Sequence, residues 1–324
     1  MKRRIEVPEG AAGARIDVVI AEALDGLSRS RIQRMVKGGS VTVDGAAARR
    51  PSATVAAGAV IELDTDDAYE VSTDVSGAVI DDLDVLHQDE HVAVVHKPAG
   101  LLTHPSSRQR GGTLADLAVQ RFGALPQVQG EDRPGIVHRL DRLTSGVMVL
   151  GLTTEALEHL KAQFKDRTVE KTYHAVVHGN PRFDSDWLTG AIESSPKSPD
   201  RMRVVPEHLR EERLVEGARV AETFLERVED FRGGSLVAAH PKTGRTHQIR
   251  VHLQAAGLPI VGDRAYGPRG GLKEPLPKGT PVMERPALHA RRLTFDHPVS
   301  GERMTFEAPL PEDMERLLAF LRGA

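Results

Sequence analysis

The sequence predicts an α+β protein in which helices flank a mixed, largely antiparallel sheet and a small α/β module comes first. Apolar residues recur at helical spacing in some stretches and alternate in others. Several pairs of short strands are separated only by a turn, which favours hairpins over a doubly wound parallel sheet. The 324 residues, 40% hydrophobic and 27% charged, are enough for one large and one small globular domain.

The small module is expected at residues 14–62. ARIDVVIAEAL predicts an amphipathic helix, and LSRSRIQRMVKGG a second one with Ser28 as N-cap and Gly38 as its stop. SVTVDG and AVIEL then predict two short strands. The inward stripes would be Ile16, Val19, Ile20 and Leu24 in the first helix and Ile32, Met35 and Val36 in the second. Four cations of the second helix would remain open to solvent: Arg29, Arg31, Arg34 and Lys37.

Residues 63–80 are acidic and weakly patterned, and we interpret them as a linker to a larger domain at 81–324. In that domain VLHQDEHVAVVHKPAG predicts strand, turn and strand, and KTYHAVVHG and SLVAAH predict further strands. TTEALEHLKAQFKD predicts a helix that buries Leu157, Leu160 and Phe164. THQIRVHLQAAG predicts a helix that stops at Gly257 and buries Ile249, Leu253 and Ala256.

Composition restricts the class of protein. The absence of cysteine excludes disulfides, thiolate catalysis and cysteine zinc sites, and it suits the cytoplasm. No stretch approaches the roughly 20 apolar residues of a membrane span, and MKRRIEVPEG lacks the apolar core of a secretion signal. We therefore expect a cytoplasmic protein without a membrane partner.

The net charge of −3 is unevenly distributed along the chain. Residues 62–90 contain eleven acids and no Lys or Arg. Without these eleven, the chain has 43 bases against 35 acids, an excess of eight positive charges. Segregated charge says more about partners than the total does, so an acidic sum is compatible with RNA as a partner.

Asp141 stands between two arginines in IVHRLDRLTSGVMVL, just before an apolar run. A carboxylate that is partly removed from water there costs several kcal/mol unless it is paired. A neighbouring arginine lowers the pKa of a carboxyl and keeps it ionised, which suits a nucleophile better than a general acid. Asp141 is therefore either a structural ion pair or a permanent anion held for chemistry.

Three other kinds of site receive little support. His138, Asp141 and Ser145 lack the G-x-S-x-G elbow of a hydrolase triad, and we expect Thr144 and Ser145 to hold the turn by local backbone hydrogen bonds. His240, His247 and His252 show no H-E-x-x-H spacing, so no metal is expected. A two-carboxylate glycosidase would need a second acid near Asp141.

Two further stretches carry chemistry. PKTGRTHQIRVHL places cations in a loop that leads into a helix, where phosphate could bind or the residues could form a solvated basic face. Within it, Arg250 lies beside the core residue Ile249 and needs a carboxylate partner. In KTYHAVVHG, Tyr173 alternates with buried positions, so it is either a core residue or a ring that stacks on a base.

Together these stretches resemble the RluA/RluD-type pseudouridine synthases. HRLDRLTSG, KTYHAVVHG and GRTHQIRVHL occur in the family's order, with HKPAGLLTHP, GDRAYG and ALHARRLTFDHP as further landmarks. The resemblance implies the pseudouridine synthase fold, Asp141 as catalytic residue, Tyr173 as active-site tyrosine and Arg250 as partner of Asp141. Residues 14–62 resemble the small RNA-binding module named after ribosomal protein S-four. The departures are Leu143, GLTTEA after the strand, and His240 with Pro241, which could alter the substrate surface.

The family reaction breaks the glycosidic bond of uridine, turns the uracil and rejoins it through carbon 5, without cofactor. Asp141 would attack the ribose or assist a glycal intermediate, and both remain open; Tyr173 would stack on uracil and could help to remove its proton. The expected partner is RNA, bound by a monomer, with the target base flipped out of its stack. The expected RNA contacts are Arg139, Arg142, Arg245 and His247, together with Arg29, Arg31, Arg34 and Lys37. Large-subunit ribosomal RNA is favoured over transfer RNA, and a non-catalytic RNA-binding protein is the strongest rival.

Overall fold

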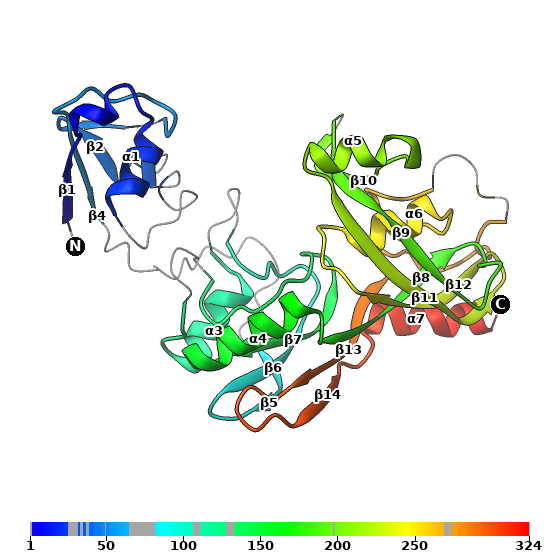
Figure 1. Cartoon of the computed structure of the whole chain (residues 1–324). Coiled ribbons are helices and arrows are strands. Elements are labelled where there is room, and N and C mark those ends of the chain that lie inside the picture. Colours follow the sequence, from blue (N-terminus) through cyan, green and yellow to red (C-terminus); the bar gives the residue numbers. More distant parts are fainter. Residues whose placement is uncertain are drawn as a thin grey trace. The chain divides into compact units, whose positions relative to one another are not determined.

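In a computed structural model, contacts group the chain into two compact units, Met1–Val79 with His104–Gly135 and Ile80–Thr103 with Ile136–Ala324 (Figure 1). No helix in the described part of the chain is long and apolar enough to span a membrane. The structure describes residues 2–24, 32, 35–36, 39–48, 50–64, 82–105, 111–127, 133–196, 198–268, 272 and 274–323. Outside these ranges lie Arg29, Arg31, Arg34 and Lys37, the expected caps Ser28 and Gly38, and residues 65–80 of the expected linker.

The first unit contains the expected small module. Helix α1 (Ile16–Ala23) packs with a sheet of order β1-β4-β2-β3, formed by β1 (Lys2–Glu6), β2 (Val41–Val43), β3 (Ala46–Ala47) and β4 (Val60–Asp64). The predicted first helix and both predicted strands are confirmed, whereas β1 was not predicted. The two predicted stripes are buried or packed against this core: Ile16, Val19, Ile20, Leu24, Ile32, Met35 and Val36.

Helix α3 (Leu114–Phe122) also belongs to the first unit and was not predicted. A capping box starts it: the Thr113 side chain accepts from the Asp116 backbone while Asp116 accepts from the Thr113 backbone. Two N–H groups that lack a helical partner are thus satisfied at its start. A short 3-10 turn, η1 (Glu9–Ala11), precedes α1.

The second unit is built on one large sheet, of order β10-β9-β11-β12-β8-β13-β7-β6-β5 with β14 on β13. Within the described residues only β13 and β7 pair in parallel, so the predicted mixed, largely antiparallel sheet is confirmed. The strands are β5 (Asp84–Gln88), β6 (Val92–Lys97), β7 (Ser145–Gly151), β8 (Glu170–His178), β9 (Ser185–Ser195), β10 (Ser198–Val204), β11 (Arg219–Phe231), β12 (Gly234–Pro241), β13 (Leu288–Asp296) and β14 (Arg303–Glu307).

The parallel pair brings β13 against the chain just after Asp141. Ser145 pairs with His289 and Gly146 with Ala290. Gly146 has a φ of 133°, and a Cβ there would overlap the backbone of Ala290. Glycine is required at this close approach, which fixes where the chain after Asp141 enters the sheet.

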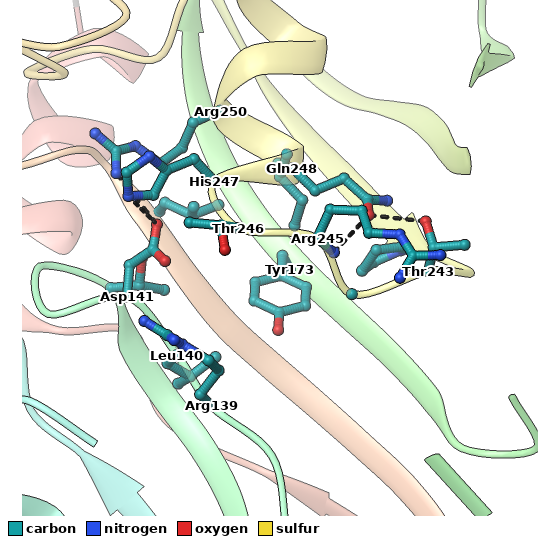
Figure 2. Close-up of a pocket in the computed structure, with 15 residues that line it drawn as sticks. Arg139, Leu140, Asp141, Tyr173, Thr243, Arg245, Thr246, His247, Gln248 and Arg250 are labelled. Atoms are coloured by element: carbon teal, nitrogen blue, oxygen red, sulfur yellow. Dashed lines mark hydrogen bonds and ion pairs between the residues drawn. The ribbon is translucent and has the colours of Figure 1, made fainter. Parts of the chain in front are cut away.

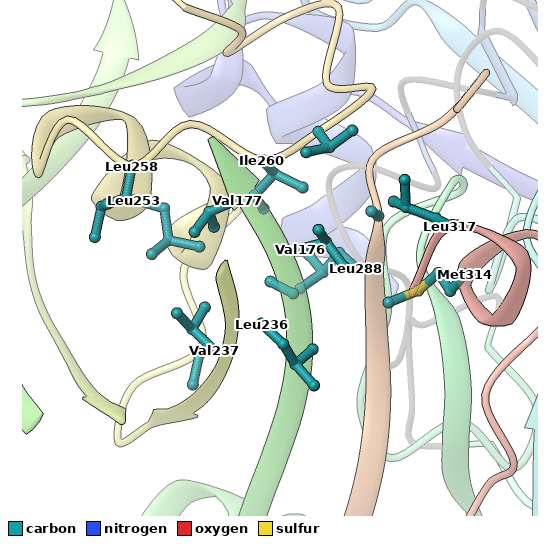
Figure 3. Close-up of a cluster of buried hydrophobic side chains, with 14 of the residues drawn as sticks. Val176, Val177, Leu236, Val237, Leu253, Leu258, Ile260, Leu288, Met314 and Leu317 are labelled. Carbon is teal, nitrogen blue, oxygen red and sulfur yellow. The ribbon is translucent and has the colours of Figure 1, made fainter. Parts of the chain in front are cut away.

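Helices cover both faces of the central strands. Helix α4 (Thr154–Asp166) buries Leu157 and Leu160, with Phe164 packed against the core as predicted. In Figure 3, Val177 and Val237 point towards α6 (Gln248–Ala255), and Leu288 lies beside α7 (Glu312–Arg322). The remaining helical segments are η2 (Glu207–Leu209) and α5 (Arg210–Val215).

Helix α6 follows the prediction except at its end. Ile249 and Leu253 are buried as expected, and a turn at Gly257 follows the helix. The prediction that Ala256 points inward is wrong, because α6 ends at Ala255 and Ala256 is exposed. The i, i+3, i+4 spacing that predicts buried residues holds only within the helix, and Ala256 lies just beyond its last residue.

Candidate active site

Asp141 lies in a turn that enters β7. The Thr144 backbone N–H donates to the Asp141 carbonyl at 3.0 Å, and every residue of β7 that follows is buried. The Asp141 side chain remains 21% exposed. The sequence therefore anchors the backbone in the core and leaves the carboxylate at the surface of a pocket.

Arg250 connects Asp141 to a second carboxylate. Its Nη1 donates to Oδ2 of Asp141 at 3.1 Å, so the predicted partnership is present as a geometric contact. Its Nε and Nη2 donate to the two oxygens of Asp263 at 2.7 and 2.9 Å. The Asp263 side chain is fully buried, and the backbone N–H groups of Ala265 and Tyr266 also donate to it. Asp263 is thus the principal partner of Arg250 and fixes the guanidinium that reaches Asp141.

Tyr173 comes from β8, on the same side of that strand as Ala175 and Val177. Its ring packs against the core cluster and also forms part of the pocket wall. Tyr173 is therefore partly a core residue, and it is also exposed to whatever binds in the pocket. Burial raises the pKa of its hydroxyl, and the negative charge of Asp141 raises it further. The hydroxyl is a phenol, not a phenolate, at neutral pH.

A single pocket brings these side chains together (Figure 2). Asp141, Tyr173 and Arg250 come from three elements that are far apart in sequence, and all three line it. In Figure 2 the Tyr173 ring lies below the loop that precedes α6, with Asp141 and Arg250 to one side. The other lining residues are Arg139, Leu140, Thr144, Pro241, Thr243, Gly244, Arg245, Thr246, His247, Gln248, Ile249 and Leu288.

The loop that carries Arg245 is held by Gln248. Its Oε1 accepts from the Thr243 hydroxyl at 2.8 Å and from the Arg245 backbone at 3.0 Å. Its Nε2 donates to the Glu222 carbonyl and to the Thr223 hydroxyl, each at 3.0 Å. A buried amide with four satisfied hydrogen bonds makes this loop a defined wall of the pocket.

Two buried basic residues, Lys97 and Arg285, donate hydrogen bonds to the backbone that follows Asp141. Lys97 Nζ donates to the carbonyls of Pro98, Leu101 and Arg142 at 2.8, 2.9 and 3.3 Å. Arg285 donates to the Leu143 carbonyl at 3.3 Å while it forms a bidentate pair with Asp313 of α7. The pKa of Lys97 is lowered to about 7, mainly by burial, which outweighs the opposing charge of Asp141 and acts with the positive charge of Arg285. Arg250 therefore fixes the side chain of Asp141, and Lys97 and Arg285 fix the backbone that follows it.

Among the residues that it describes, the structure does not bring together those of the hydrolase triad or of a metal site. His138 accepts from the Val149 backbone at 3.2 Å and stacks on Phe164, and burial lowers its pKa to about 3. The expectation that Ser145 bonds the local backbone is wrong: its hydroxyl pairs with Nδ1 of the distant His289 at 2.9 Å. No triad results. Across the described ranges, no group of His, Cys, Asp and Glu could hold a metal ion.

The expected RNA-contacting residues fall into three sets. Arg139, Arg245 and His247 line the pocket. Arg142 does not; its Nε donates to the Gly100 carbonyl at 2.9 Å. The four cations of the second predicted helix lie outside the described residues.

Sequence reasoning assigned no role to Asp263, Tyr266 or Lys97. Asp263 and Tyr266 belong to GDRAYG, and Lys97 ends the apolar strand VAVVHK. The available signal was the same one that singled out Asp141, a charged residue next to a core element. Asp263 is followed directly by Arg264, but its partner is Arg250, 13 residues earlier, so the sequence did not indicate the pair.

The raised pKa of Tyr173 leads to a direct test. Up to about pH 11, one unit above the ordinary tyrosine value, Tyr173 should contribute no phenolate. Phenolate absorbance over that range should therefore be the same for the native protein and Tyr173→Phe. In denaturant the two should differ by one of three tyrosines, which serves as the control. A loss of phenolate signal near pH 10 in the folded variant would contradict the assignment.

Comparison with known proteins gives a consistent result. A family model described as RNA pseudouridylate synthase matches residues 91–255, and an S-four domain model matches residues 14–61. The ribosomal large subunit pseudouridine synthase D of Xanthomonas campestris is 40% identical, covering 99% of this chain and 92% of its own. The corresponding protein of Pseudomonas aeruginosa is 36% identical, covering 99% and 96%.

A solved structure agrees with these matches. Human RNA pseudouridylate synthase domain containing 4 has 27% identity and a TM-score of 0.55, covering 74% of this chain and 93% of its own. The family model covers half of the chain, and the curated relatives cover nearly all of it. The chain belongs to the RNA pseudouridylate synthase family and carries an S-four domain in its N-terminal part.

Proposed function

We propose that this protein isomerises uridines in bacterial large-subunit ribosomal RNA, with Asp141 as the reacting carboxylate. The relatives described above are named as ribosomal large subunit pseudouridine synthases, which supports this substrate. The single observation that carries the chemistry is the chain of contacts Asp263–Arg250–Asp141 at the edge of a pocket walled by Tyr173.

The reaction exchanges one bond of the ribose for another. The bond from nitrogen 1 to the ribose breaks, and one from carbon 5 forms. Carbon 5 loses a proton, and nitrogen 1 gains one. Asp141, paired with Arg250, either attacks the ribose or takes a ribose proton to give a glycal; the contacts are compatible with both.

Tyr173 is proposed to stack on the flipped uracil. A ring with a firmly protonated hydroxyl suits this role. For the same hydroxyl to take the proton of carbon 5, it would have to pass its own proton on in the same step. The negative charge of Asp141 opposes ionisation of this hydroxyl, because it raises the pKa of Tyr173.

Phosphate groups are proposed to bind cations around the pocket mouth. Arg139 and Arg245 line the pocket, and Arg142 follows Asp141 directly. His247 also lines the pocket and would contact the RNA there as a neutral ring. On β8, outside the pocket lining, burial and to a lesser extent the positive charges of Lys242 and Arg167 lower the pKa of Lys171 to about 8. Cations that repel one another in the free protein gain most from a polyanion such as RNA.

The domain arrangement is part of the proposal. Residues 14–62 would bind RNA, 63–80 would link, and 81–324 would catalyse. Arg29, Arg31, Arg34 and Lys37 would add phosphate contacts that raise affinity more than selectivity. Because each element of the pocket comes from one chain, a monomer would suffice, and a cytoplasmic site would give access to ribosomal RNA.

The test is pseudouridine mapping of ribosomal and transfer RNA from cells with the gene, without it, and with Asp141→Asn in its place. We expect large-subunit sites that are lost equally in the last two strains. Loss confined to transfer RNA would replace the substrate and keep the enzyme. Sites that persist with Asp141→Asn would favour the non-catalytic alternative.

A further inference from the structure

His247 occupies a strained position beside Asp141. It is the residue before α6, and its backbone adopts the left-handed conformation with a φ of 55°. A residue other than glycine in this region costs about 1–3 kcal/mol, and such positions cluster at functional sites. The side chain lines the pocket and is 23% exposed.

A hydrogen-bond chain determines which nitrogen of His247 carries the proton. The Met202 backbone N–H donates to the Tyr266 hydroxyl oxygen at 2.6 Å. That hydroxyl lies 2.9 Å from Nδ1 of His247 and has one hydrogen to give. In the part of the chain that the structure describes, Nδ1 is the only acceptor beside that hydroxyl, which assigns the Tyr266 hydrogen to Nδ1 and the hydrogen of a neutral His247 to Nε2.

The protonated nitrogen faces the carboxylate of Asp141. Nε2 lies 3.9 Å from Oδ2, the same oxygen that accepts from Arg250. This separation is too long for a hydrogen bond in the free protein, but catalytic contacts often tighten only when substrate is bound. Among the described residues, none of the hydrogen bonds to the Asp141 side chain involves Oδ1.

We propose that His247 is a positioning residue that, with Arg250, holds Oδ2 of Asp141 and leaves Oδ1 as the oxygen that reacts. Tyr266 sets the tautomer that makes this possible, and it links the β10 strand to the pocket through Met202. The identity of the reacting oxygen rests on the proposed function. The tautomer does not.

The charges around His247 are consistent with a neutral ring. Burial lowers its pKa, and the positive charges of Arg250 and Arg139 act in the same direction. Asp141 and Asp263 act in the opposite direction. Tyr266, which packs its ring 4.9 Å from the Arg250 guanidinium carbon, donates to Nδ1 and so favours the unprotonated form of that nitrogen.

Kinetics test the positioning. In His247→Leu we expect kcat to fall about 10- to 100-fold with the RNA KM within twofold, because the lost contact matters after binding. His247→Gln keeps an amide N–H at a similar reach and should recover part of that loss. Tyr266→Phe keeps the ring under Arg250 and should lower kcat about fivefold. The matched control is His208→Leu, at an exposed position in η2, with no change expected.

Nitrogen NMR of histidine-labelled protein tests the tautomer without RNA. The resonances missing in His247→Gln identify His247, and we expect Nε2 protonated in the native protein and a mixture in Tyr266→Phe. A native Nδ1–H tautomer would overturn the inference, and so would full kcat in His247→Leu. If the protein modified no RNA at all, the NMR result would still stand, so failure of the proposed function is recognised separately.

Discussion

Asp141→Asn is expected to abolish pseudouridine formation and to leave the fold intact. The amide has the shape of the carboxylate but cannot attack a ribose or accept its proton. Stability should change little, because Arg250 keeps its bidentate pair with Asp263 and the site is 21% exposed. Loss of a reacting group typically costs a factor of at least about a thousand in turnover. The measurement is single-turnover conversion of an RNA substrate, together with RNA binding and unfolding.

The matched control is Asp166→Asn. Asp166 is an exposed carboxylate in the last turn of α4, so the same chemical change there should leave turnover unaltered. The Asn preparation must be checked for deamidation, because a trace of restored Asp141 would mimic activity. Turnover of Asp141→Asn above about 1% of the native rate, in a clean preparation, would remove Asp141 from the reacting role.

Helices and strands could be predicted from the sequence because the spacing of their buried residues repeats within a single element. Leu157 and Leu160 of α4 and the alternation around Tyr173 in β8 are visible within a dozen residues. Strand β13 is different, because its neighbours β7 and β8 lie more than a hundred residues earlier in the chain. Its pairing depends on Gly146, whose missing side chain gives no hydrophobic signal.

The candidate site was predictable in part for the same reason. Asp141 stands out because a charge next to an apolar run is unusual, Arg250 and Tyr173 stand out because they fall beside core positions, and the resemblance supplied their roles. Nothing in the sequence indicated that Arg250 would give two of its donors to Asp263 and only one to Asp141. Nor could it show the Tyr266 hydroxyl between Met202 and His247. Such contacts depend on how distant segments meet.

Arg250→Met should lower both stability and activity, for separable reasons. The variant leaves Asp263, whose side chain is fully buried, without its cation. Removing one partner of a buried pair costs about 3–5 kcal/mol, and the backbone N–H groups of Ala265 and Tyr266 compensate only in part. Urea unfolding measures the stability change. Activity should also fall, because Oδ2 of Asp141 loses its hydrogen bond from Nη1.

The double variant Arg250→Met with Asp263→Asn separates the two effects. Removing both charges eliminates the unpaired carboxylate, so unfolding free energy should recover by several kcal/mol relative to Arg250→Met. Activity should not recover, because Asp141 is still without its partner. If turnover returned along with stability, Arg250 would be needed only for folding, and its contact with Asp141 would have no catalytic consequence. A double variant that stays unstable would mean that Arg250 stabilises the fold mainly through packing on Tyr266.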